Sequence, residues 1–247
     1  SEMYHIDFVR CRAIRAGSNG FKTLGGTVET RTWHRFVSFT DCYVEDCGLG
    51  GGTNCAAIAV HLSTDVTITN LTVRPKGARA DGYSSREAVS IAGSHRVTVL
   101  NVSVTNPEYA GIYLNSALGE YSDITVDGAR IATGETATPL VISRSNITVR
   151  RVVMRNVRVN HSGTGYVIST AKSDTSTLIG GIRVELELMN SSAITQICTG
   201  TGRPDITADL RGPVPSDLSY TGFADGSRWW ADDGRLGLRQ SGTWRWL

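Results

Sequence analysis

Four carboxylates are the residues of this sequence whose type and spacing could support acid–base chemistry. Each lies in a polar segment beside a short apolar phrase that recurs along the chain, so two of them could converge if these phrases are strands of adjoining coils. Cleavage of a glycosidic bond needs two carboxyl groups roughly 5 to 9.5 Å apart. The alternative is that they are solvated surface charges, because Lys and Arg lie nearby. The four candidates are Asp81, Glu87, Glu108 and Glu120.

Ring side chains form a second set of candidates, because aromatic faces stack on sugar rings. Four of the five tryptophans lie close to the C-terminus, three of them next to Arg228 or Arg245. These tryptophans either contact sugar or plug the open end of the fold, and the single histidine of the set is either a ligand or a surface residue. The candidates for glycan binding are Tyr113, His61, Trp229, Trp230, Trp244 and Trp246.

Two apolar phrases that repeat in step would position these residues. The first reads Val66-Thr-Ile-Thr-Asn-Leu-Thr-Val73 and returns at residues 97–104. The second is anchored at positions 58, 89, 112 and 140, which are 31, 23 and 28 residues apart. Alternating Val, Ile and Thr favour strands over helices. A constant strand frame with loops of variable length predicts one solenoid turn per repeat.

One pattern occurs in residues 89–99 and again in residues 140–149: [Val/Ile]-x-[Ile/Leu], then a polar turn, then [Val/Ile]-Thr-[Ile/Val]. With this pattern, the chain resembles the right-handed parallel β-helix (pectin-lyase-like) superfamily over about residues 4–212. The resemblance implies an all-β solenoid and leaves the activity open, because lyases, hydrolases, adhesins and phage tailspikes share this fold. Ala80-Asp81-Gly82 is faintly similar to the Asn-Thr-Asp motif of polygalacturonases, but the other motifs of that site are missing. A pectate-lyase calcium site cannot be assembled either.

Strand alternation assigns the faces. The inward positions are Ile58, Val60, Val89, Ile91, Ile112, Leu114, Leu140 and Ile142. The outward rows are Ala59, Ser90, Tyr113 and Val141, followed by His61, Ala92, Asn115 and Ser143. On the other sheet we expect a hydroxyl ladder of Ser38, Thr67, Thr98, Thr125 and Thr148. The small outward side chains fit close packing against a neighbouring subunit, which predicts a homotrimer.

Composition limits the partners. The 247 residues, 40% of them hydrophobic, carry a net charge of +2 without a basic stripe, so a nucleic acid partner is not expected. No apolar run is long enough for a membrane span. We expect no cofactor and no metal. The strand pattern begins at Ile6 without a preceding amphipathic helix, which favours the C-terminal part of a longer polypeptide, or else an end capped by a partner.

Five cysteines, an odd number, argue against a disulfide framework. Cys11 and Cys42 fall at matching places in successive repeats, where they are expected to stack in the core. Cys47 and Cys55 flank a glycine-rich loop, and whether they pair is left open. No Cys or His pairs stand at zinc-ligand spacing.

The last segment breaks the repeat. Two prolines after Gly212 end the solenoid, because proline cannot continue a central strand. The prediction is a β-helix over residues 1–212 and a cap or trimerisation meander over residues 213–247, with turns at Asp232-Asp-Gly234 and Gln240-Ser-Gly242. The meander resembles Trp-rich segments at the ends of tail proteins from phages of actinobacteria.

The sequence therefore favours a trimeric, tailspike-like protein of a phage virion tail that contacts host-surface polysaccharide. Two alternatives remain. One is a polysaccharide-degrading enzyme, a lyase or a glycoside hydrolase, on the same β-helix. The other is a purely structural shaft.

Overall fold

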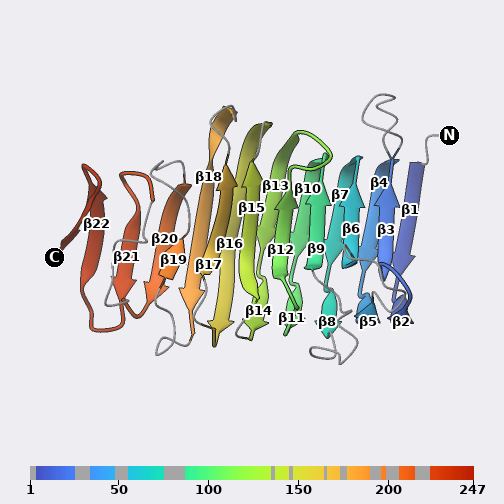
Figure 1. The fold of residues 1–247 in the computed structure, drawn as a ribbon, viewed down its shortest axis with the longest axis horizontal. Helices are drawn as coiled ribbons and strands as arrows, with labels where there is room; N and C mark the ends of the chain where they lie inside the picture. Colours follow the sequence, from blue (N-terminus) through green and yellow to red (C-terminus); the bar gives the residue numbers. More distant parts are fainter. Residues whose placement is uncertain are drawn as a thin grey trace.

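All secondary structure in the described part of the chain is β-strand. The computed structural model describes residues 4–25, 34–47, 55–74, 87–134, 137–144, 147–163, 166–172, 177–189, 196–198, 206–214 and 223–247. The strands stack in parallel along the long axis of the molecule (Figure 1). This confirms the predicted all-β, parallel solenoid. The described residues include no helix that could cross a membrane.

Each coil contributes to three parallel stacks. The first holds β1 (Tyr4–Val9), β4 (His34–Thr40), β7 (Ser63–Thr69), β10 (His95–Leu100), β13 (Tyr121–Asp127) and the first part of β16 (Thr148–His161). The second holds β2 (Arg12–Ala16), β5 (Tyr43–Cys47), β8 (Thr72–Arg74), β11 (Ser103–Thr105), β14 (Arg130–Thr133) and the end of β16. Because β16 belongs to both stacks, they join in one 16-stranded sheet, which continues through β18 (Thr177–Leu188) and β20 (Ile206–Gly212).

The third stack is a separate seven-stranded sheet. It holds β3 (Phe21–Leu24), β6 (Ala56–His61), β9 (Glu87–Ala92), β12 (Ala110–Asn115), β15 (Thr138–Arg144), β17 (Tyr166–Lys172) and β19 (Gln196–Cys198). All eight predicted inward side chains lie on these strands and are 0% exposed. The inward assignment is confirmed.

The outward rows of this sheet have the predicted register, with Ser90 opposite Ala59 and Tyr113. Their small members are nevertheless buried within the single chain, since Ala59 and Ala92 are 0% and Ser90 is 4% exposed. These residues therefore offer no free face to a neighbouring subunit. The argument for a homotrimer from small outward side chains is wrong, although the trimer itself stays a prediction.

The hydroxyl ladder is correct for four of its five members. Ser38, Thr67, Thr98 and Thr125 lie in mutual register. The fifth is Val153 rather than Thr148. The reason is that Val152-Val-Met154, and not Ile147-Thr-Val149, takes the place of Ile124-Thr-Val126 in the sheet, since Thr125 pairs with Val153 and Tyr121 with Val149. The phrase at residues 147–149 imitates the repeat five residues too early (153 − 148).

A left-handed residue turns the chain between the first and second stacks of each coil. These corner residues have φ between 52° and 74° and are Arg10, Asp41, Asn70, Asn101, Gly128 and Asn156. Asn and Asp tolerate this conformation better than other side chains do. Neighbouring corners also bond to one another, for example Asn70 Nδ2 to Asp41 Oδ1 at 2.9 Å. We call this series the corner ladder.

A sulfur-containing column runs beside the corners, as predicted. The backbone N–H groups of Tyr43 and Thr72 donate to the carbonyls of Cys11 and Cys42, which places the two cysteines in successive coils. Leu71 continues the column and is 1% exposed. Cys11, Cys42, Cys47 and Cys55 are thiols, so no Cys47–Cys55 disulfide is present.

The C-terminal segment forms the predicted three-stranded meander. β21 (Arg228–Ala231) pairs in parallel with β20, and β22 (Leu236–Gln240) and β23 (Thr243–Trp246) follow in antiparallel order. The carboxylate of Asp209 on β20 forms one ion pair with Arg228 of β21 (2.8 Å) and another with Arg183 of β18 (2.7 Å). It therefore connects the meander to the solenoid strands. The meander therefore extends the solenoid sheet.

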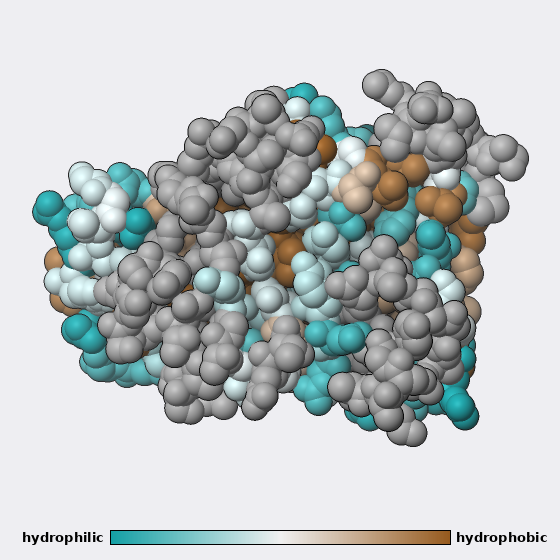
Figure 2. Space-filling view, in the orientation of Figure 1, coloured by the Kyte–Doolittle hydropathy of each residue, from teal (hydrophilic) through white to brown (hydrophobic). Residues whose placement is uncertain are grey.

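Exposed apolar side chains gather on the first coils. Val9, Ile14, Leu24 and Phe36 are each 46% to 55% exposed. Figure 2 shows brown, apolar surface toward the N-terminal end of the molecule, whereas paler and more polar surface prevails elsewhere on this face.

Candidate functional site

A pocket of about 410 Å³ lies on the outer side of the seven-stranded sheet. It brings together three residues that the sequence singled out, namely His61, Glu87 and Tyr113. The other lining residues are Asn19, Ala56, Ser90, Ala92, Tyr109, Asn115, Ala117 and Leu118. Side chains from β6, β9 and β12 thus meet because parallel stacking aligns three successive coils.

His61 contributes a neutral imidazole to this pocket. Burial of the ring, and next the positive charge of Lys22, lower the pKa of His61 to about 4. Among the residues that the structure describes, the buried Nε2 atom has no hydrogen-bond partner. A buried polar atom without a partner carries a free-energy cost of roughly 1 to 3 kcal/mol. A ligand hydroxyl could recover that hydrogen bond.

Aromatic rings and a carboxylate occupy the opposite part of the pocket. Tyr109 and Tyr113 meet edge to face, with ring centroids 5.6 Å apart. Glu87, at the start of β9, is 5% exposed and stands in register between Ala56 and Ala110. Small neighbours on both sides leave room beside its side chain. Tyr109 is a pocket residue that the sequence reasoning missed, and its position just before β12 was the available signal.

The spacing of the polar groups does not suit a catalytic pair. Glu87 is in register with Ala56, and His61 lies five residues further along β6. At about 3.3 Å per residue, the Cα atoms of Glu87 and His61 are roughly 17 Å apart. Two groups that act on one glycosidic bond stand about 5 to 9.5 Å apart at their reacting atoms, so Glu87 and His61 would have to extend toward each other along the strands to share one bond. Their separation does suit contacts with several units of an extended ligand.

The three described members of the four predicted carboxylates do not form one cluster. Glu108 precedes β12 and so lies at the same end of the sheet as Glu87, but it does not line the pocket. Glu120 precedes β13, at the other end of these strands, and interacts electrostatically with His95. Asp81 lies outside the described residues. Among the described residues, no group of three or more His, Cys, Asp or Glu side chains could hold a metal ion.

The four C-terminal tryptophans divide into two environments. Trp229 is 0% exposed, and Trp244 and Trp246 pack against it with centroids 5.8 and 6.3 Å away. These three rings cover the end of the core. Trp230 points to the opposite face, is 37% exposed, and lies under the guanidinium groups of Arg211 and Arg228 at 5.6 and 4.9 Å. Trp230 is therefore the most exposed of the four indole rings.

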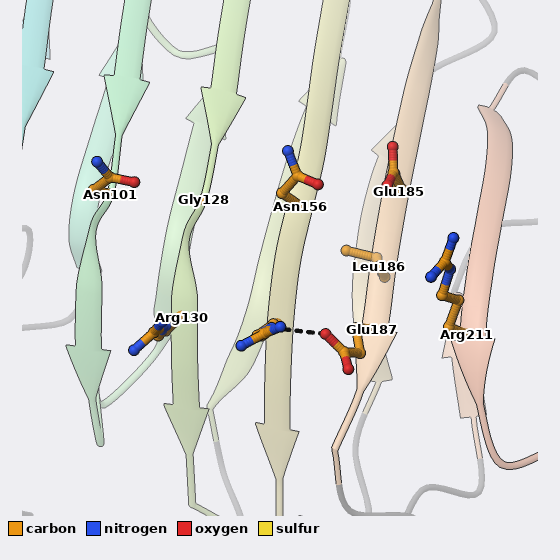
Figure 3. A pocket seen from close by; sticks show the side chains of 9 residues that line it. Asn101, Gly128, Arg130, Asn156, Glu185, Leu186, Glu187 and Arg211 are labelled. Carbon is orange, nitrogen blue, oxygen red and sulfur yellow. Dashed lines mark hydrogen bonds and ion pairs between the residues drawn. The ribbon is translucent and has the colours of Figure 1, made fainter. Parts of the chain in front are cut away.

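A second pocket, of about 390 Å³, lies on the 16-stranded sheet (Figure 3). Arg130, Arg158 and Arg211 line it together with Glu185 and Glu187. The sequence reasoning missed this pocket, because its members come from five successive coils. In comparisons with known proteins, no family model, no curated protein and no solved structure matches the chain.

Proposed function

We propose that this protein contacts a host-surface polysaccharide and serves as a tailspike-like component of a phage tail. The observation that carries the proposal is the pocket on the seven-stranded sheet, where an aromatic wall, a neutral histidine and amide and carboxylate groups face one elongated space. Sugars bind through the same combination of ring stacking and hydrogen bonds to hydroxyls. A parallel solenoid presents such a surface rigidly along its axis.

Binding is favoured over cleavage by the separation of the polar groups. The roughly 17 Å between the Cα atoms of Glu87 and His61 follows from about 3.3 Å per strand residue, and no described residue of the pocket supplies a second carboxylate. A lyase or hydrolase would need an acid and a base within reach of one bond. A structural shaft, the other alternative, would need no aromatic pocket at all.

The test is incubation of the protein with capsule and cell-wall glycans from candidate hosts. Retention on one glycan without new products is the expected result. New absorbance of an unsaturated uronate would instead identify a lyase, and new reducing ends a hydrolase. If no glycan is retained and none is cleaved, the protein is a shaft and the proposal fails.

Substitutions locate the contact. Tyr113→Ala is expected to weaken retention about fivefold, since a stacking contact contributes on the order of 1 kcal/mol. Thr98→Ala, on the outer ladder of the other sheet, is the matched control and should bind normally. Because the pKa of His61 is about 4, retention should not change between about pH 5 and pH 8. A loss of retention centred near pH 6.5 would contradict the neutral histidine.

A homotrimer is part of this proposal, because closed symmetry is the usual state of such assemblies. Light scattering after size exclusion should give about three times 26.6 kDa. A monomer at micromolar concentration would remove this part of the proposal and leave the glycan contact standing.

A further inference from the structure

The second pocket lies beside the one glycine of the corner ladder. Most corners carry Asn or Asp, and Asn156 Nδ2 donates to Asp127 Oδ1 at 2.8 Å. At Gly128 the Asn101 amide packs against the backbone, since a Cβ atom there would lie 2.6 Å from Asn101 Oδ1. Figure 3 shows Gly128 between the amides of Asn101 and Asn156. These three residues form one wall of the pocket, which we call the hollow.

A row of charged side chains runs beside this hollow, one from each successive strand. Arg130 of β14 is in register with Arg158 of β16, which is followed by Glu187 of β18 and Arg211 of β20. Trp230 of β21 ends the row. Five strands at a spacing of about 4.8 Å give the row a length of roughly 19 Å. We call this series the charged row.

The charges in the row are available to a ligand. Arg158 Nε donates to Glu187 Oε2 at 2.7 Å, yet the two side chains remain 52% and 43% exposed. In the part of the chain that the structure describes, Arg130 has no acidic partner, and Arg211 contacts only the ring of Trp230. An exposed surface ion pair contributes little stability. Fold stability therefore does not account for this concentration of arginine.

The composition of the pocket indicates the chemistry of its ligand. Three arginines and two glutamates line it, which gives a net charge of +1 (3 − 2). Duplex DNA, with one charge per about 1.7 Å, would meet carboxylates along this path and is disfavoured. Guanidinium groups bind carboxylates in two-pronged fashion, while the amides and glutamates can bind hydroxyls. Trp230 adds a ring face at the end of the row.

We propose that the charged row and its hollow bind an acidic polysaccharide, one whose carboxylates are spaced along the chain and separated by hydroxyl-bearing rings. The groove lies on the 16-stranded sheet, away from the aromatic pocket. The protein therefore has a second glycan contact with its own selectivity for charge. This inference adds a site to the proposed function and does not depend on the first pocket.

The test is affinity electrophoresis of the whole chain in gels that contain polygalacturonate, alginate or hyaluronate, with neutral dextran and duplex DNA for comparison. We expect retardation by at least one acidic glycan, sensitive to salt, and none by dextran. Arg211→Ala should weaken it tenfold or more, since a charge-assisted hydrogen bond contributes roughly 1.5 to 3 kcal/mol. Trp230→Ala should weaken it about fivefold, since a stacked ring contributes about 1 kcal/mol.

The matched control is Arg151→Ala. Arg151 lies on the same strand as Arg158, is 65% exposed and pairs with Asp123, but it does not line the pocket. This variant should bind like the unmodified protein, which separates the site from a general effect of charge. Gly128→Asn is a further test, because it fills the hollow with the residue that other corners carry. It should weaken binding while the thermal midpoint stays within a few degrees.

Four results would overturn the proposal: no retardation by any acidic glycan, equal retardation by DNA, unchanged binding in Arg211→Ala, or equal loss in Arg151→Ala. The thermal midpoint of each variant shows whether it is folded. Tyr113→Ala should leave binding to the acidic glycan intact. Failure of this proposal and failure of the first pocket are therefore distinguishable.

Discussion

Replacing Trp229 and Trp230 separately tests whether the C-terminal meander both closes the core and presents a binding surface. The two residues are adjacent in sequence and point to opposite faces of β21. Trp229 is 0% exposed, and its Nε1 donates to the carbonyl of Gly212 at 3.1 Å. Trp230 is 37% exposed. The pair therefore offers the same chemical deletion in a buried and in an exposed setting.

The magnitudes differ by several-fold. Trp229→Ala removes a buried ring and leaves a cavity, which costs about 3 to 5 kcal/mol. The Gly212 carbonyl also loses its donor, so the loss should lie at the upper end of that range. Trp230→Ala removes only exposed ring contacts with two arginines, at about 1 kcal/mol or less.

The assay combines urea unfolding, followed by circular dichroism of the sheet, with limited proteolysis. Because coils contact mainly their neighbours, the loss at Trp229 should appear first as cleavage within residues 213–247, ahead of global unfolding. Trp230→Ala should resist protease like the unmodified protein. Equal destabilisation by both substitutions would refute the assignment of faces. A Trp229→Ala protein with unchanged stability would refute the capping role.

Three further predictions concern the solenoid. Gly128→Ala should lower the free energy of unfolding by about 1 to 2 kcal/mol, because the φ of 74° at this position is left-handed. Gly128→Asn should lower it less, since asparagine tolerates that conformation. Thermal midpoints would rank the two variants, and the reverse order would contradict the account of the corner ladder. Burial opposes ionisation of Asp209, but its two arginine partners outweigh this and hold its pKa below the usual range. Its contribution to stability is thus complete above about pH 4 and is lost as pH falls through the lowered pKa. Asp209→Asn should therefore lower the free energy of unfolding by roughly 1.5 to 3 kcal/mol at neutral pH. Urea titrations at several pH values should show that the stability of this variant falls less steeply toward acid pH, and an unchanged pH dependence would exclude this role. Ile91→Ala should cost about 2 to 5 kcal/mol and Thr98→Ala about 1 kcal/mol or less in the same titrations, and equal losses would mean a register error.

The sequence predicted the solenoid because burial on alternate positions leaves a periodic mark. The inward set on β6, β9, β12 and β15 and the cysteine column were both correct, since each depends on a repeat that returns in every coil. The left-handed corners are also visible in the sequence, because Asp41, Asn70 and Asn101 recur at regular spacing. Gly128 and Asn156 continue the series. That series could have been found from its spacing of 27 to 31 residues.

The sequence could not predict which of two similar phrases takes a strand position or which outward residues are covered. Thr148 was misplaced because Ile147-Thr-Val149 imitates the repeated phrase five residues before Val152-Val-Met154, which takes that place in the sheet. The row at Ala59 and Ala92 was read as surface, whereas the single chain buries it.

The sequence by itself therefore determined the fold, the core faces and the set of polar and aromatic candidates. Only the tertiary structure decided which of these meet. His61, Glu87 and Tyr113 come together because three coils align, and Arg130, Arg158 and Arg211 form a row because their strands pair in register. The physical reason is that repeat periodicity fixes each strand against its neighbours, while loop lengths and bulges, which carry no periodic signal, set the registers that build a site.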